Sequence, residues 1–252
     1  MVLFGYDVPD RSDEQAVESK FKEVLSNVDR KYKDAKIEIW RQNQLIGFLR
    51  PFLSLALRLS YRSNLPFRTH KSWSQQAEMR SGFNAGKEQE NFISSLQAGL
   101  REGTAAVHIR VYGEPGIGKT RLVLEATRTD DLSPLVIYCD SAGKFRDSNL
   151  MNELLKDDNS FSTIMVLDEC DPDSRAYIWD KFKHLGSRIK VVSIYNEHDA
   201  TSGNITYLEA PPLGQEQIIG IIQGYGIQKD QAERWAELCS GSPRVAHIVI
   251  VK

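Results

Sequence analysis

The sequence has few cysteines and no pattern that would use them together. Three cysteines occur in 252 residues, far apart and without CxxC spacing. This excludes a disulfide framework and a cysteine-based zinc site, and it indicates reduced thiols in the core of a cytoplasmic protein. The three are Cys139, Cys170 and Cys239.

The sequence also lacks a strong net charge and a long apolar run. Its 32 basic and 34 acidic residues give a net charge of −2, so the chain as a whole is not a polycation. The longest apolar run, LIGFLRPFLSLALRL at 45–59, is interrupted by Arg50 and Pro51. It is shorter than the roughly 20 residues of a membrane span, and therefore predicts a core-facing segment and no membrane partner.

The first 60 residues alternate between strand-like and helix-like segments. The pattern predicts a strand at 2–8, an amphipathic helix at 12–35, a strand at 36–40 and a helix at 41–59. Such an α/β unit is small for an independent domain. We expect it to be a fragment of a domain or to dock on the rest of the chain.

Residues 61–85 lack clean periodicity and are predicted to form a basic linker. Between 41 and 80 the only acid is Glu78, against seven basic residues. These are Arg41, Arg50, Arg58, Arg62, Arg68, Lys71 and Arg80. The stretch could face nucleic acid, or it could be a solvated linker that pairs with acidic neighbours.

From residue 86 to residue 210, short apolar runs alternate with helical or loop segments. The runs are AVHIRVYG, PLVIYCD, STIMVLDE, IKVVSIYN and NITYLEA. Strands that alternate with helices are typical of parallel βαβ units. The fold class is therefore α/β, a doubly wound parallel sheet of five strands with helices on both faces.

The most informative stretch is VYGEPGIGKTRLV at 111–123. Residues 113–120 fit G-x-x-x-x-G-K-[ST] between a predicted strand and a predicted helix, although a chance match in a glycine-rich turn is the alternative. Glycines let successive N–H groups point into one concavity, and the helix adds its own first amides. Lys119 would reach the β- and γ-phosphates, and Thr120 would take one Mg²⁺ position. The nucleotide-binding residues predicted here are Gly113, Glu114, Pro115, Gly116, Ile117, Gly118, Lys119, Thr120 and Arg121.

An acid at the end of a neighbouring strand is the expected partner of such a loop. Asp168 follows the apolar residues 164–167, at the strand end where ligands sit in such sheets, and is predicted to hold Mg²⁺. Glu169 could orient or deprotonate an attacking water. The alternative is that both acids cap the next helix, and Asp171 and Asp173 have the position of caps.

Two further polar residues stand where an ATPase could use them. Asn196 ends the strand KVVSIYN and could hold the water between Glu169 and the γ-phosphate, or it is an ordinary turn asparagine. Arg244 follows a Gly-Ser-Pro turn at the start of a helix. From a separate lid it could reach the phosphates, or it is a surface arginine.

In this order and spacing, GEPGIGKT, IMVLDE, VVSIYN and GSPR resemble the AAA+ and STAND branch of P-loop ATPases, over residues 83–252. The segment 86–100 is similar to the helix that closes over adenine in those families. The resemblance implies ATP and Mg²⁺ as cofactors, strand order 5-1-4-3-2, and a helical lid at 211–252 that we expect to be incomplete. It matches Lys119 and Thr120 to Walker A, Asp168 and Glu169 to Walker B, Asn196 to sensor 1, Pro243 to the STAND GxP proline, and Arg244 to a position at or beside sensor 2.

Some features depart from the family pattern. SIYNEHD lacks the arginine that STAND proteins commonly carry near the end of the sensor 1 strand. Arg188 is a candidate finger toward a neighbouring subunit. The first 60 residues weakly resemble the end of Mrr-type restriction nucleases, but no D…(D/E)xK set precedes KIEIWRQNQLIGFL, so cleavage is not expected.

These features support three hypotheses about function. The first is the ATPase switch of a STAND-like regulatory or antiphage protein, in which ATP binding favours self-association. The second is an AAA+ motor or loader that contacts nucleic acid through residues 41–80. The third is an interaction module that binds ATP without hydrolysing it.

Overall fold

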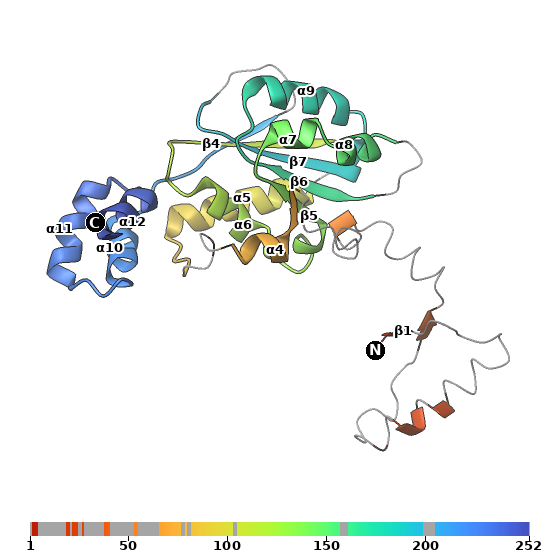
Figure 1. The fold of residues 1–252 in the computed structure, drawn as a ribbon, viewed down its shortest axis with the longest axis horizontal. Coiled ribbons are helices and arrows are strands. Elements are labelled where there is room, and N and C mark those ends of the chain that lie inside the picture. Colours follow the sequence, from red (N-terminus) through yellow and green to blue (C-terminus); the bar gives the residue numbers. More distant parts are fainter. Residues whose placement is uncertain are drawn as a thin grey trace. The chain divides into compact units, whose positions relative to one another are not determined.

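The computed structural model divides the chain into two compact units, Met1–Pro51 and Phe52–Lys252. It describes residues 2–4, 19–20, 22–24, 27, 38–40, 53–54, 66–76, 79, 82–102, 105–156, 161–198 and 205–251 (Figure 1).

The first unit contains a two-stranded parallel sheet. Strands β1 (Val2–Phe4) and β2 (Glu38–Trp40) pair in register, with Leu3 opposite Ile39. Parallel strands need a crossover connection, and the described residues between them, within 19–27, are helical. The predicted strand–helix–strand order is thus confirmed for these residues. The rest of the unit lies outside the described residues, so the likeness to Mrr-type nucleases stays a prediction.

The second unit is built on a six-stranded sheet in the order β3-β5-β6-β7-β4-β8. Its strands are β3 (Phe67–Thr69), β4 (Val107–Tyr112), β5 (Val136–Cys139), β6 (Thr163–Leu167), β7 (Ile189–Ile194) and β8 (Thr206–Glu209). The five predicted strands are parallel and follow the expected 5-1-4-3-2 order. The predicted number was one too low, because β3 adds an antiparallel strand at the edge beside β5.

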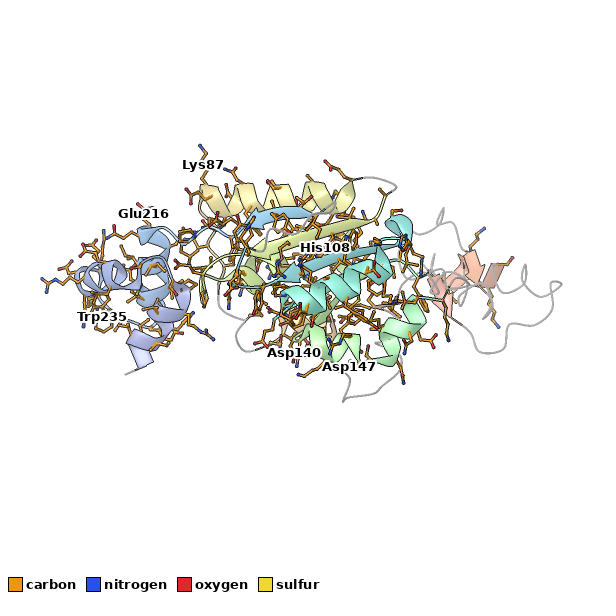
Figure 2. The ribbon with its side chains drawn as sticks, turned by 90° about the horizontal axis from the view of Figure 1, so that it is seen from above. Lys87, His108, Asp140, Asp147, Glu216 and Trp235 are labelled. Carbon is orange, nitrogen blue, oxygen red and sulfur yellow. The ribbon has the colours of Figure 1, made fainter. Side chains whose placement is uncertain are left out.

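Helices cover both faces of this sheet, as predicted (Figure 1). Side chains alternate across each strand, so Val136 and Tyr138 face one apolar cluster while Ile137 and Cys139 face the other. The first cluster is closed by α4 (His70–Ser74), α5 (Lys87–Arg101) and α6 (Lys119–Ala126). The second is closed by α7 (Ala142–Arg146), α8 (Asn149–Leu154) and α9 (Pro172–Phe182). In Figure 2, Lys87 on the first face and Asp140 and Asp147 on the second lie on opposite sides of the sheet. Two short 3₁₀ helices, Ser133–Leu135 and Gly186–Arg188, precede β5 and β7.

Residues 66–76 are not a linker, which corrects the prediction made for 61–85. They form the edge strand β3 and the helix α4, whose Trp73 is fully buried. Both elements are too short to show a hydrophobic period, since one is three residues long and the other five. Of the seven basic residues between 41 and 80, the structure describes Arg68 and Lys71.

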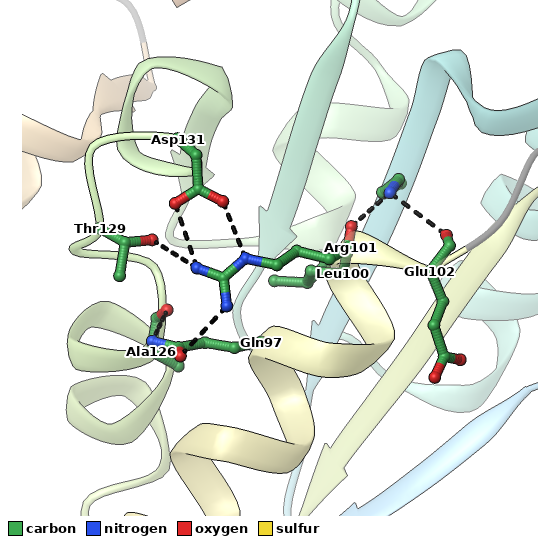
Figure 3. A network of polar contacts seen from close by, with 8 residues as sticks. Gln97, Leu100, Arg101, Glu102, Ala126, Thr129 and Asp131 are labelled. Carbon is green, nitrogen blue, oxygen red and sulfur yellow. Dashed lines mark hydrogen bonds and ion pairs between the residues drawn. The ribbon is translucent and has the colours of Figure 1, made fainter.

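Polar contacts hold α5 beside α6, as Figure 3 shows. Gln97 Nε2 donates to the Ala126 carbonyl at 3.0 Å, and the guanidinium of Arg101 donates to both oxygens of Asp131 at 2.8 and 3.1 Å. The ion pair is exposed and contributes little stability. The apolar contact beneath it, through the buried Leu96 and Leu100, therefore dominates the packing of the two helices.

A three-helix unit comes after the sheet. It consists of α10 (Gln215–Gln223), α11 (Lys229–Cys239) and α12 (Pro243–Val251), packed around a small apolar cluster of their own. All three cysteines of the chain are buried and none forms a disulfide, as expected for core thiols. No helix in the described part of the chain is long and apolar enough to cross a membrane.

Candidate functional site

The glycine-rich loop joins β4 to α6 at the carboxyl end of the sheet. β4 ends at Tyr112, and α6 begins at Lys119 with Gly118 as its N-cap. Gly116 and Gly118 have φ angles of 85° and 95°, which side-chain-bearing residues rarely adopt. The loop therefore has the strand–loop–helix context that the motif requires, and the first amides of α6 are left for a ligand.

Lys119 is buried and surrounded by neutral oxygens. Its Nζ donates to the carbonyls of Gly113 and Glu114, both at 2.8 Å, and to Asn196 Oδ1 at 2.9 Å. Burial lowers the pKa of Lys119, the carboxylate of Asp168 acts in the opposite direction, and Arg244 lowers the pKa further. An ammonium held by neutral acceptors fits a site that receives an anion.

Thr120 and Asp168 meet at the first turn of α6. Thr120 Oγ1 donates to Asp168 Oδ2 at 2.7 Å, although the two residues are 48 positions apart. The backbone N–H of Glu169 donates to Asp168 Oδ1 at 3.0 Å, and the N–H of Asp168 donates to the Cys139 carbonyl at 2.9 Å. The carboxylate thus lies beside the hydroxyl with which it is predicted to share Mg²⁺.

The sequence analysis missed Tyr138 on β5. Its hydroxyl donates to Asp168 Oδ2 at 3.1 Å, and burial raises its pKa, with the Asp168 carboxylate acting in the same direction. Tyr138 stood in PLVIYCD as one more apolar strand residue. The expected strand order, which places β5 beside β6, was the available signal, because Tyr138 pairs with Val166, two residues before Asp168.

Glu169 occupies a backbone conformation that is unusual for its residue type. Its φ is 45°, in the left-handed region, and its side chain is exposed. Bonds on the following residue fix the turn: Arg110 Nη1 donates to the Cys170 carbonyl at 2.6 Å, and the Cys170 N–H donates to the Ile194 carbonyl at 3.0 Å. Strained residues concentrate at functional sites, so this turn merits a functional hypothesis.

Other acids and arginines have structural partners. Asp171 caps α9 by accepting from the Ser174 N–H at 2.9 Å, as expected, whereas Asp173 lies within the first turn of that helix and not at its cap. Arg121 donates to Glu125 and to the Met79 carbonyl, both at 2.8 Å, so its guanidinium is engaged away from the loop. Arg188, the candidate finger, donates to the carbonyls of Leu154 and Phe161 and is held against its own subunit.

The three-helix unit touches the loop through residues 242–244. The Arg244 N–H and the Ser242 hydroxyl both donate to the Gly116 carbonyl, at 3.3 and 3.2 Å. A Cβ on Gly116 would lie 2.9 Å from the Cβ of Arg244, so only glycine allows this approach. The exposed Arg244 is thus brought to the glycine-rich loop, near Lys119.

The site fits a magnesium-bound phosphate ligand. Mg²⁺ prefers oxygen ligands, keeps several waters, and is bound through one or two protein groups plus substrate phosphates. Thr120 Oγ1 and Asp168 Oδ2 are such groups, and the buried Lys119 ammonium lies in the same loop. Within the described ranges no cluster of three or more His, Cys, Asp or Glu residues could hold a metal ion alone.

Comparison with solved structures identifies the fold. The Hsp104–ADP complex of S. cerevisiae superposes with a TM-score of 0.53 and 18% identity over 75% of this chain and 33% of that one. Hsp104 bound to ATPγS and FITC casein gives 0.51 and 16% over 71% and 40%. A STAND protein with a tetratricopeptide repeat sensor from Pyrococcus horikoshii gives 0.43 and 12% over 68% and 30%, too low to argue from. Neither a protein-family model nor a curated protein sequence matches the chain.

These likenesses show that the chain shares the α/β fold of the two Hsp104 structures, a mostly parallel sheet with helices on both faces. The match spans less than half the length of each Hsp104 chain. Activity, ligands and partners are therefore matters for proposal.

Proposed function

We propose that the chain is an ATP-binding and ATP-hydrolysing switch module of a STAND-like signalling or defence protein. The observation that carries the proposal is the meeting of four side chains at the carboxyl ends of neighbouring strands. Lys119 bonds to Asn196, and Thr120 bonds to Asp168, each within 2.9 Å. Motifs 77 and 48 residues apart are thereby assembled into one site.

Each residue then has a defined task. The loop amides and Lys119 would bind the β- and γ-phosphates, with Lys119 exchanging carbonyl partners for phosphate oxygens. Thr120 and Asp168 would hold Mg²⁺, which supplies charge neutralisation at the phosphates. Glu169 would accept the proton of the attacking water, and Asn196 would hold that water in line.

The switch depends on the contact between the lid and the loop. Arg244 stands over the loop at the start of α12 and would bind the phosphates only when the lid is closed. A ligand that binds the closed form better than the open form shifts the population toward it. In this proposal the closed form self-associates and hydrolysis resets it, in a cytoplasmic protein with reduced thiols.

Replacement of Lys119 by Ala tests the proposal. We expect affinity for Mg·ATP, measured by titration calorimetry, to fall at least about 100-fold, because charge-assisted bonds to two phosphates are lost. Lys183→Ala, at the end of α9 and exposed, is the matched control and should bind like the parent. Titrations of the parent with GTP and with ADP measure its preference for the base and for the number of phosphates. Unchanged ATP affinity in Lys119→Ala would remove the phosphate-binding assignment.

The nucleic-acid hypothesis lacks such support. The basic stretch on which it depends falls mostly outside the described residues, and α4 within it buries Trp73 in the core. A DNA affinity that falls steeply with salt would restore it.

A further inference from the structure

The carboxylate of Asp168 is held from two elements besides its own strand. Thr120 on α6 and Tyr138 on β5 both donate to Oδ2, at 2.7 and 3.1 Å. A carboxylate oxygen has two lone pairs, and the whole group has about four acceptor sites. When Thr120 turns its oxygen toward a metal ion, the bond from Tyr138 is the side-chain contact that remains on this oxygen.

Tyr138 is itself held rigidly. Its ring stacks on Trp73 with centroids 4.3 Å apart and planes 9° from parallel. Trp73 is fully buried and Tyr138 is 6% exposed, so both rings are confined by the surrounding cluster. Offset stacking of this kind adds about 0.5–1.5 kcal/mol beyond the area that is buried.

Trp73 contributes the face of its ring to the contact with Tyr138, and its indole nitrogen takes no part in it. Trp73 Nε1 is buried without a hydrogen-bond partner in the described part of the chain. A buried donor without an acceptor lowers the stability of the folded protein by about 1–3 kcal/mol. The presence of a large flat ring at this position in spite of that cost supports a packing role, in which Trp73 confines the ring of Tyr138.

We propose that Tyr138 positions the metal-binding carboxylate of Asp168, and that the β3–α4 segment acts on the metal site through Trp73. The inference rests on the proposed function, since it concerns Mg²⁺ bound with ATP. It gives a role to the segment whose sequence resembles a linker. Tyr138 acts through Asp168 and does not touch the reacting atoms.

Tyr138→Phe is the first test, because it keeps the ring stack and removes only the hydroxyl. ATP binding is titrated by calorimetry over a series of Mg²⁺ concentrations and again in EDTA. We expect the Mg²⁺ concentration that half-saturates the ATP complex to rise about fivefold, as for the loss of one hydrogen bond. Affinity for ATP in EDTA should stay within about twofold of the parent, because the loop and Lys119 are untouched.

Trp73→Leu is the second test, since it keeps an apolar side chain but removes the flat wall. We expect its Mg²⁺ half-saturation to rise about twofold, less than that of Tyr138→Phe, because the hydroxyl is still present. Thermal unfolding of both variants verifies that they fold.

The outcomes separate the inference from the proposed function. If Tyr138→Phe and the parent require the same Mg²⁺ while Lys119→Ala loses ATP, the positioning role is wrong and the ATP site stands. An equal fall in ATP affinity with and without Mg²⁺ would make Tyr138 merely structural. If the parent binds no ATP at all, the proposed function itself fails.

Discussion

The sheet side and the lid side of the candidate site are built differently. On the sheet side, side chains bond directly to one another: Lys119 to Asn196 at 2.9 Å and Thr120 to Asp168 at 2.7 Å. On the lid side, Ser242 and Arg244 bond only to the Gly116 carbonyl among the contacts found with the loop, at 3.2 and 3.3 Å. The sheet side of the site is thus preorganised by bonds between side chains, whereas the lid meets the loop through only these two bonds among the described residues. Outside the site, the lid is also attached through Gln217, whose Nε2 donates to the Asn84 carbonyl at 2.8 Å and to Gln89 Oε1 at 3.1 Å.

Packing deepens this difference. The two clusters on the sheet contain large side chains such as Trp73, Phe145 and Phe182, all fully buried. The lid cluster has six buried members, of which three are alanines. Stability scales with buried apolar area, so the lid is expected to open or unfold at lower free energy than the sheet. A rigid half and a movable half are what a nucleotide-gated switch requires.

The sheet side should carry the largest single effect, through Glu169. Replacement by Gln removes the base but keeps the size of the side chain. We expect phosphate release to fall by about 100-fold or more, equivalent to ~2.7 kcal/mol, while ATP affinity stays within about twofold. Glu153→Gln on α8 is the control, since Glu153 is exposed and pairs with Lys156. If release continued at the parent rate, another group would have to be the base. If the parent itself released none, the module would bind ATP without hydrolysing it.

The second largest effect is expected from acid, which should lower the stability of the folded sheet through His108. Its Nε2 lies 2.8 Å from Ser193 Oγ on the α9 side, at the centre of the stick view in Figure 2. Burial lowers the pKa of His108 to about 3, and Arg175 and Arg110 act in the same direction. The unfolded chain, with a histidine pKa of about 6.5, therefore binds the proton first as pH falls. Stability is full above pH 6.5 and should decrease by about 2 kcal/mol by pH 5.

Urea unfolding at pH 7 and pH 5, followed on parent and His108→Gln, measures this contribution. The variant should lose that much less stability between the two pH values. If parent and variant lost equal stability between pH 7 and pH 5, His108 would take up its proton in the folded protein. The sheet would then be less rigid than its packing indicates.

The residues that were predicted from sequence share one property, since each belongs to a short motif that can be recognised in the sequence. Glycines around Lys119 and an acid after an apolar strand are short-range patterns, and the order of the five strands was implied by the family resemblance of these motifs. Tyr138 and Trp73 could not be found in this way. Their roles come from contacts 30 and 65 residues distant along the chain, which arise only once β3 and β6 flank β5.

The same limit applies to the roles that the sequence suggested for two arginines. Arg121 and Arg188 stand at positions that suggest a ligand or a neighbouring subunit, but carbonyls of their own chain accept their hydrogen bonds. Sequence cannot reveal which carbonyls remain available after packing. The backbone of Arg244 lies on the loop, and the contact of its side chain with phosphate stays a prediction.

Arg244→Ala should have the smallest effect and tests the lid side alone. The exposed guanidinium is predicted to bind phosphate only in the closed form, so ATP affinity should fall about fivefold, near 1 kcal/mol. Arg234→Ala, also on the lid but on α11, is the matched control and should leave affinity unchanged. Identical affinity and turnover in Arg244→Ala would make it a surface arginine. An effect as large as that of Lys119→Ala would instead mean that the lid is as preorganised as the sheet.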